Sequence, residues 1–192
     1  YAGVDHPHVA ASLSTVGSSL WAMGDRAAGV ALKREALDMR RRLYAGVDHP
    51  DLAASLGDVG NSVEQLGEHA AGVRLMRESL AMQRRLYAFV DHPNRASTLN
   101  NLGCSLEAMG DRAAGVALQR EALDMLQRLY AGVDHPLLAT SLNNVGKSLE
   151  AMGERATGMA MKREALEMRR CMYAGVDHPL LSGRSTAPAA PW

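Results

Sequence analysis

The 192-residue sequence has little of several features that would assign it to a specialised class of protein. It contains only two cysteines and 4% aromatic residues, which argues against a disulfide-stapled fold and leaves few side chains for stacking on bases. Basic and acidic side chains number 21 each, so the formal net charge of zero provides no general attraction to nucleic acid or an anionic membrane. No apolar run approaches the roughly 18 residues of a membrane-spanning helix. We therefore expect a globular protein with no nucleic-acid or membrane partner.

A seven-residue motif, Tyr-Ala-X-Val-Asp-His-Pro, recurs every 43 residues and divides the chain into repeats. Full repeats occupy residues 1–43, 44–86, 87–129 and 130–172, followed by a partial fifth, 173–181, and a tail, 182–192. The tail is rich in turn residues and is expected to be flexible. Repeats one and three are identical at 30 positions and differ at 13. Arrays of this kind stack one structural unit on the next, and each unit buries its apolar face against its neighbours.

Each repeat carries two apolar stripes with helical spacing, so the chain is expected to be all-α. In the second repeat, intervals of four and three residues predict one helix from about Pro50 to Leu66 and another from about His69 to Leu86. Proline suits the first helical position because it has no N–H to leave unpaired there. The aspartate of Asp-His-Pro is expected to cap the first turn. Each repeat is thus predicted to be a helix hairpin.

The residues within a repeat resemble the tetratricopeptide repeat (TPR) pattern. Seven of its positions are matched without a gap by Leu13, Val16, Gly17, Leu20, Gly24, Ala36 and Leu37. A period longer than the usual 34 residues, His-Pro before the first helix, and Leu-Asn-Asn-Leu at 99–102 resemble the TPR branch of kinesin light chains and nephrocystin-like proteins. The resemblance covers residues 1–181. It implies a right-handed superhelical solenoid of four helix-turn-helix repeats plus a partial fifth, whose first helices line a concave groove.

The sequence departs from this family at the position where the two helices of a repeat cross. The family's small alanine is replaced there by Gly29, Gly72, Gly115 and Gly158. A glycine inside a helix costs roughly 0.5–1 kcal/mol relative to alanine. We expect a closer approach of the two helices as compensation.

Differences between repeats are concentrated on the first helix. Nine of the 13 differences between repeats one and three lie there, on the predicted groove, while the scaffold positions are held fixed. Two explanations are open. The groove is shaped for a non-repetitive ligand, or outward positions vary without constraint.

Asparagines on the first helices are the strongest candidates for contact with a ligand. An asparagine amide offers both a donor and an acceptor, so a row of them can pair with the main chain of an extended peptide; groove asparagines of related TPR proteins are used in this way. The alternative is that one asparagine of each adjacent pair, 100/101 and 143/144, only packs or bonds within its helix. Lys147 is either an anchor for a ligand carboxylate or a solvated lysine. The predicted peptide-binding residues are Asn61, Asn100, Asn101, Asn143, Asn144, Lys147 and Glu107.

The charges near the predicted groove favour a neutral or mildly basic peptide. Lys147 stands opposite four acidic residues, Asp58, Glu64, Glu107 and Glu150. The cluster of Lys, Arg and Asn by which chaperone-binding TPR domains hold an acidic C-terminus is missing. The acidic peptides with an aromatic anchor that kinesin light chains favour are also poorly matched by the row of glutamates.

Catalysis, metal binding and cofactor binding are not expected. The histidines at 6, 49, 92, 135 and 178 recur once per repeat beside a proline and are not gathered, whereas a metal site needs three or four converging ligands. No nucleophile with a base, paired carboxylates or phosphate-binding loop is recognisable. Cys104 and Cys171 lie 67 residues apart, which favours free thiols and a reducing, cytoplasmic location. Phe89 replaces the glycine of the other connections and is expected to pack against a neighbouring helix.

We therefore predict a non-catalytic protein-interaction module that binds an extended peptide or partner protein in the concave groove. The alternative is a structural spacer, or an array that forms a homo-oligomer end to end through its exposed repeat ends. Since the sequence begins with Tyr1 rather than methionine, it is expected to be part of a longer protein.

Overall fold

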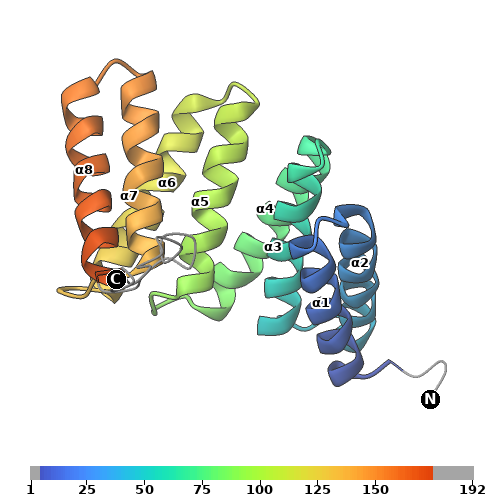
Figure 1. Ribbon diagram of the computed structural model, residues 1–192. Coiled ribbons are helices and arrows are strands. Elements are labelled where there is room, and N and C mark those ends of the chain that lie inside the picture. The colour runs from blue at the N-terminus through green and yellow to red at the C-terminus, as the bar shows by residue number, and fades with distance from the viewer. Residues whose placement is uncertain (1–4, 175–192) are drawn as a thin grey trace, which may run out of the picture.

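The computed structural model describes residues 5–174, which form eight α-helices and contain no β-strand. Consecutive helices pair as hairpins, one hairpin per repeat, and the hairpins stack into a curved array (Figure 1). The helices are α1 Pro7–Ala22, α2 Arg26–Leu43, α3 Pro50–Gln65, α4 His69–Leu86, α5 Pro93–Ala108, α6 Arg112–Leu129, α7 Pro136–Ala151 and α8 Arg155–Met172. The two helices predicted for the second repeat are confirmed to within one residue. The predicted tail and all but two residues of the partial fifth repeat lie outside the described residues.

The His-Pro dipeptide begins each first helix, but the capping side chain is the histidine. Nδ1 of His49 accepts a hydrogen bond from the backbone N–H of Asp51 at 3.2 Å, and the histidines at 6, 92 and 135 make the same bond. The proline occupies the first turn, as expected. The prediction that the aspartate caps the helix is wrong, because its carboxylate is engaged elsewhere.

The aspartate of the motif pairs with an arginine 37 residues later, at the end of the second helix of the same repeat. Arg85 donates from Nε and Nη2 to the two carboxylate oxygens of Asp48, at 2.6 and 2.7 Å. The same bidentate pair joins Arg42 to Asp5 and Arg128 to Asp91. These hydrogen bonds lower the pKa of the three aspartates. Each pair fastens the beginning of a repeat to its end.

The fourth repeat lacks this ion pair, because Cys171 occupies the place of the arginine opposite Asp134. Replacing Cys171 by arginine is expected to complete the pair and to raise the urea midpoint of unfolding slightly, since exposed ion pairs contribute little. The gain should shrink at high salt and disappear when Asp134 is also replaced by asparagine. A midpoint unchanged by Cys171→Arg at low salt would contradict the role assigned to this pair.

The capping histidines at 49, 92 and 135 also stack on the tyrosine that begins their repeat. The ring centroids of Tyr44 and His49 lie 3.6 Å apart with 4° between the ring planes, and two further repeats show the same stack. Burial, together with the charge of Arg95, lowers the pKa of His92 below its ordinary value of 6.5. The unfolded chain then binds more protons below that pH, so the stability contributed by neutral His92 is present above about pH 6.5 and declines on acidification. The periodic histidines thus have a structural role as caps and stacking partners.

The two helices of each repeat cross at a pair of glycines. A Cβ built on Gly115 would lie 2.6 Å from the backbone oxygen of Gly103, and one built on Gly103 would lie 2.7 Å from that of Gly115. The pairs in the other repeats are Gly17 with Gly29, Gly60 with Gly72, and Gly146 with Gly158. No side chain larger than hydrogen fits at these distances, so the closer helix approach expected from these glycines is confirmed.

The connection that contains Phe89 differs from its equivalents. The hydrogen bond from Val47 N–H to the Tyr44 oxygen, 3.0 Å, has an equivalent from Val90 to Tyr87 at 3.3 Å, but Gly46 has φ of +77°. Within residues 5–174 no residue other than glycine has a positive φ, so the backbone at Phe89 adopts another conformation. The Phe89 side chain is fully exposed. The expectation that it packs against a helix is therefore wrong.

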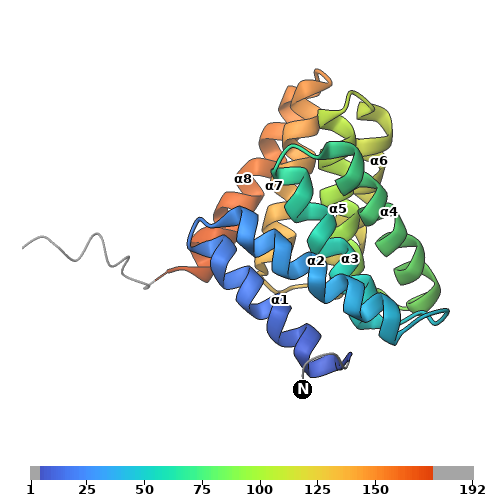
Figure 2. The ribbon, with the colours of Figure 1, turned by 90° about the vertical axis from the view of Figure 1, so that its right-hand side faces the viewer.

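The first helices of the repeats line the inner side of the array. Neighbouring first helices touch directly, α3 with α5 and α5 with α7, whereas among the described residues the second helices of adjacent repeats make no contact of similar extent. Packing closer on one side than on the other curves the stack, and the quarter-turn view shows the same succession of hairpins (Figure 2). The concave surface predicted to carry the function is thus formed by α1, α3, α5 and α7.

Candidate functional site

The asparagines of the concave face divide into an engaged pair and an accessible set. Asn100 is only 7% exposed, and its Oδ1 accepts a hydrogen bond from Nδ2 of Asn144 at 3.3 Å. This bond joins α5 to α7 and occupies one group on each amide. Asn61, Asn101 and Asn143 are half-buried and keep part of their surface accessible. The bond of the first pair joins two helices, whereas the alternative expected a bond within one helix. Ligand contact by the accessible set stays a prediction.

Glu107 and Lys147 lie further along the groove in different surroundings. The hydroxyl of Ser148 lies 2.8 Å from Oε2 of Glu107 and also 2.8 Å from Oε1 of Gln119, so Glu107 is held within the array. Its Oε1 is buried and has no hydrogen-bond partner among the described residues. Lys147 is exposed and lines a shallow depression beside Glu150, which pairs with Lys162 at 2.8 Å.

The thiol of Cys104 lies on α5 near this cluster and is not poised for reaction. Burial raises the pKa of this thiol, and the neighbouring Glu107 carboxylate raises it further. Gln119 donates a hydrogen bond from Nε2 to Sγ at 3.4 Å. The nucleophilic thiolate is therefore disfavoured.

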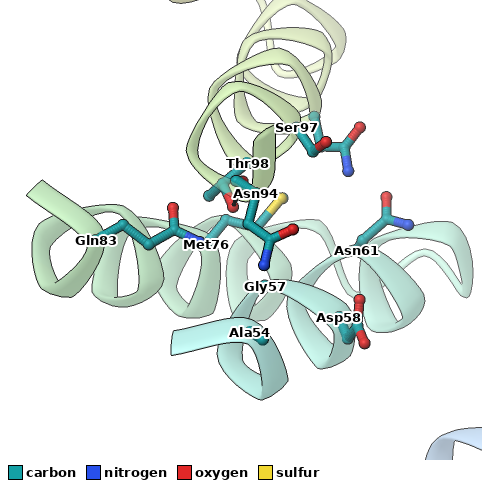
Figure 3. A pocket seen from close by; sticks show the side chains of 10 residues that line it. Ala54, Gly57, Asp58, Asn61, Met76, Gln83, Asn94, Ser97 and Thr98 are labelled. Atoms are coloured by element: carbon teal, nitrogen blue, oxygen red, sulfur yellow. Dashed lines mark hydrogen bonds between the residues drawn. The ribbon is translucent and has the colours of Figure 1, made fainter. Parts of the chain in front are cut away.

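The concave face is hollowed between α3 and α5. The cavity has a volume of about 220 Å³, smaller than the 300–1,000 Å³ typical of small-molecule sites, and suits one side chain of a larger ligand. Figure 3 shows Asp58 and Asn61 extending from α3, Asn94 and Ser97 from α5, and Gln83 on α4 at the left of the view. The full lining consists of Ala54, Gly57, Asp58, Asn61, Met76, Gln83, Asn94, Ser97, Thr98 and Asn101.

Two substitutions between repeats shape this hollow. On the first helix, Gly57 stands where the other repeats have Ser14, Asn100 and Asn143. On the second helix, Gln83 stands where they have Arg40, Leu126 and Arg169. An equivalent hollow of about 170 Å³ lies between α5 and α7, where Asn100 and Leu126 line it, so Gly57 and Gln83 make the hollow between α3 and α5 larger and change its lining.

Gln83 and Asp58 give the hollow its polar character. Gln83 is only 1% exposed, and its Oε1 has no hydrogen-bond partner among the described residues. Asp58 is accessible but lies on a concave surface, where the surrounding protein displaces water and raises the pKa of its carboxyl group. The positive charges of Lys33 and Arg40 lower this pKa, but by less. Of the predicted site residues, Asn61 and Asn101 line this hollow.

The sequence contained a signal for this hollow that our prediction did not use. Variable polar residues of the first helices predict Asn61 and Asn101 but not Gly57 or Gln83. A residue that lies at the back of the groove comes from the second helix, and its variation between repeats is the available signal. Arg, Gln, Leu and Arg at positions 40, 83, 126 and 169 differ in size and charge, as do Lys, Met, Gln and Lys at positions 33, 76, 119 and 162.

Residues 5–174 contain neither a metal-binding cluster nor a membrane-spanning helix. Within the described part of the chain, no group of three or more His, Cys, Asp or Glu side chains is placed to hold a metal ion. Among helices α1 to α8, none combines the length and apolar character needed to cross a membrane.

The sequence profile of the tetratricopeptide repeat family matches residues 8–85 and 94–170, and the chain belongs to this family. The fold and the repeated hairpins agree with that assignment. TPR arrays are in general non-catalytic protein-interaction modules, so protein partners are indicated. No curated protein is significantly similar to the chain in sequence.

Solved structures with a similar fold include kinesin light chain-like TPR proteins. BtubC (BKLC) from P. vanneervenii superposes with a TM-score of 0.75 at 20% identity, covering 99% of this chain and 74% of that one. The nearly identical TPR-like repeats described as a kinesin light chain of Podosopora anserina give a TM-score of 0.70 at 19% identity, covering 89% and 79%. At this level of identity the likeness shows the fold. It agrees with the resemblance to the longer-repeat TPR branch.

Proposed function

We propose that the array binds an extended, neutral or mildly basic peptide segment of a partner protein along its concave face. The observation that carries this proposal is the hollow between α3 and α5, where amides from two neighbouring repeats, Asn61 and Asn101, border one cavity. An amide that donates and accepts can pair with a peptide group of an extended chain whatever its side chains are. Asn143 continues the row on α7.

The charge of the surface supports the choice of ligand. Asp58 borders the hollow, and none of the described residues that line it is basic. Lys147 lies further along the groove, where Glu150 is already paired with Lys162. An acidic peptide would meet the carboxylate of Asp58 in the hollow, whereas a neutral or basic one would not be repelled.

A peptide-display selection against the purified chain tests this function. Enriched peptides are expected to lose about tenfold or more in affinity when Asn61 and Asn101 are both replaced by alanine, because two or more hydrogen bonds of about 1 kcal/mol each are removed. The control replaces Gln65 and Gln127, two exposed amides that do not line the hollow, by alanine. The proposal fails if no peptide is enriched, or if both double variants bind equally well.

A second candidate function, end-to-end self-association, is favoured by the outer faces of the terminal hairpins. Val16 on α1 is 50% exposed, whereas its equivalent Val59 is 1% exposed. On α8, Leu166 is 47% exposed, whereas its equivalent Leu123 is 4% exposed. These are the surfaces by which internal repeats stack on one another. Self-association predicts a sedimentation mass that rises with protein concentration, and a constant monomer mass would exclude it.

A further inference from the structure

The first repeat shows what kind of group occupies the space between two neighbouring first helices. Arg40 on α2 extends between α1 and α3, where its Nη1 donates to Oγ of Ser14 at 2.9 Å and also to Oγ of Ser55. The planar, charged guanidinium of Arg40 thus bridges α1 and α3 from the side of the second helix. The residues equivalent to these three in the next repeat are Gln83, Gly57 and Thr98.

The hollow between α3 and α5 is therefore the place that Arg40 fills one repeat earlier. Gly57 removes the side chain that Ser14 provides, and its Cβ position would lie 3.4 Å from Oγ1 of Thr98. Gln83 is shorter than arginine and leaves its buried Oε1 without a partner among the described residues. Leaving such a buried acceptor unpaired is unfavourable, so a donor that reaches it is stabilised.

We propose that this hollow binds the guanidinium of an arginine side chain of the partner peptide, with Gln83 Oε1 as acceptor at its back and Asp58 as the negative charge at its rim. The proposal deepens the proposed function, on which it rests, by naming the side chain that the groove recognises. The ligand arginine would enter the hollow between α3 and α5 from the concave side. Arg40 reaches the equivalent space between α1 and α3 from the second helix of its repeat.

The chemistry of the lining favours a guanidinium over other groups. The acceptors around the hollow are side-chain oxygens from three helices, and a guanidinium offers five N–H donors in a fixed plane. A carboxylate ligand would bring acceptors toward Gln83 Oε1 and a second negative charge toward Asp58. An ammonium group is a compact point charge and matches the bridging geometry of Arg40 less well.

The test uses small probes, so that it does not depend on whether the whole groove binds a peptide. Nα-acetyl-arginine methylamide is titrated into the ¹⁵N-labelled chain, with the isosteric, uncharged citrulline derivative and the lysine derivative as comparisons. Saturable shifts of the Gly57 backbone amide and the Gln83 side-chain amide are expected with the arginine probe, with at least about fivefold weaker binding of the other two. Equal binding of the citrulline probe, or no shift at Gly57 and Gln83, would overturn the proposal.

Two variants test separately the contribution of the Asp58 charge and that of the empty volume of the hollow to binding of the arginine probe. Asp58→Asn is expected to weaken the arginine probe about threefold or more, whereas Asp124→Asn, the same change at an exposed site on α6, should leave it unaltered. Gly57→Ser with Gln83→Arg rebuilds the arrangement of the first repeat and should abolish the shifts, because the chain then fills its own hollow. Circular dichroism establishes that each variant is folded. Unchanged binding in both Asp58→Asn and the double variant would overturn the assignment even if the peptide selection succeeds.

The two proposals fail in different ways. If display selects peptides that depend on Asn61 and Asn101 but contain no arginine, the groove binds and the arginine subsite is wrong. If the arginine probe binds at Gly57 while display selects nothing, the subsite holds and extended peptide binding is wrong.

Discussion

Replacing Gly115 by alanine is expected to lower the free energy of unfolding by about 1–3 kcal/mol. The new Cβ would lie 2.6 Å from the backbone oxygen of Gly103 and 2.5 Å from Cγ of Glu107. The side chain of Glu107 can turn aside, but the carbonyl of Gly103 belongs to a helix, so the two helices must separate. Alanine would gain about 1 kcal/mol at an unobstructed helical position. The clash is expected to outweigh that gain, and urea unfolding followed by circular dichroism measures the difference.

Gly57→Ala provides the matched control for this prediction. Gly57 is also inside a helix, but its Cβ would come no closer than 3.3 Å, to Oγ of Ser79, a side-chain atom. This variant should therefore be clearly less destabilised than Gly115→Ala. Equal effects of the two changes would show that helix propensity, and not the crossing distance, controls stability at these glycines.

Replacing Val59 by alanine is expected to lower the free energy of unfolding by about 2–3 kcal/mol. The same change at Val16 should lower it by less than about 1 kcal/mol. The two valines occupy the same position in consecutive repeats. Val59 is packed in a buried cluster with Val30 and Leu37, while Val16 has no helix against its outer face within residues 5–174. The decrease in the free energy of unfolding on Val→Ala therefore depends on how much apolar surface the valine buries against the preceding repeat. Chemical denaturation of both variants under identical conditions measures the two values.

A large effect of Val16→Ala would mean that the outer face of α1 is covered in solution. Repeating the measurement at several protein concentrations then shows whether a second copy or another segment of the chain packs on this face. A cost that grows with concentration indicates a second copy of the chain. A constant cost indicates another segment of the same chain, and in either case the outer face of α1 is not free.

The repeated hairpins were predictable because the apolar period and the positions of glycine and proline act locally. The stripe in the second repeat and the break after Gly67 located α3 and α4 to within a residue. The partner of the Asp-His-Pro aspartate was not predictable in this way. Arg85 is 37 residues from Asp48 in the chain and meets it only when the hairpin closes. With the aspartate engaged, the histidine takes over the cap.

The candidate groove was predicted in outline, because variable first helices must lie on some exposed face. Individual contacts depend on distances between neighbouring repeats, which periodicity does not supply. Asn100 and Asn144 lie 44 residues apart and bond to each other, a pairing that a list of polar positions could not distinguish from solvent exposure. Gln83 comes from the second helix of the repeat and lines the hollow beside Gly57, although the residue is only 1% exposed.

The ion pair between the beginning and the end of a repeat bears on how such an array changes length during evolution. Asp48 and Arg85 belong to one repeat, as do Tyr44 and His49, so a duplicated 43-residue segment carries both partners of each contact. Unequal recombination in register can therefore add or delete a unit without leaving a lone charge or an unstacked ring. Loss of the arginine at Cys171 affects its own repeat alone. Lengthening by whole units, followed by divergence of the inner helices, is a route by which a nearly uniform scaffold acquires one distinctive hollow.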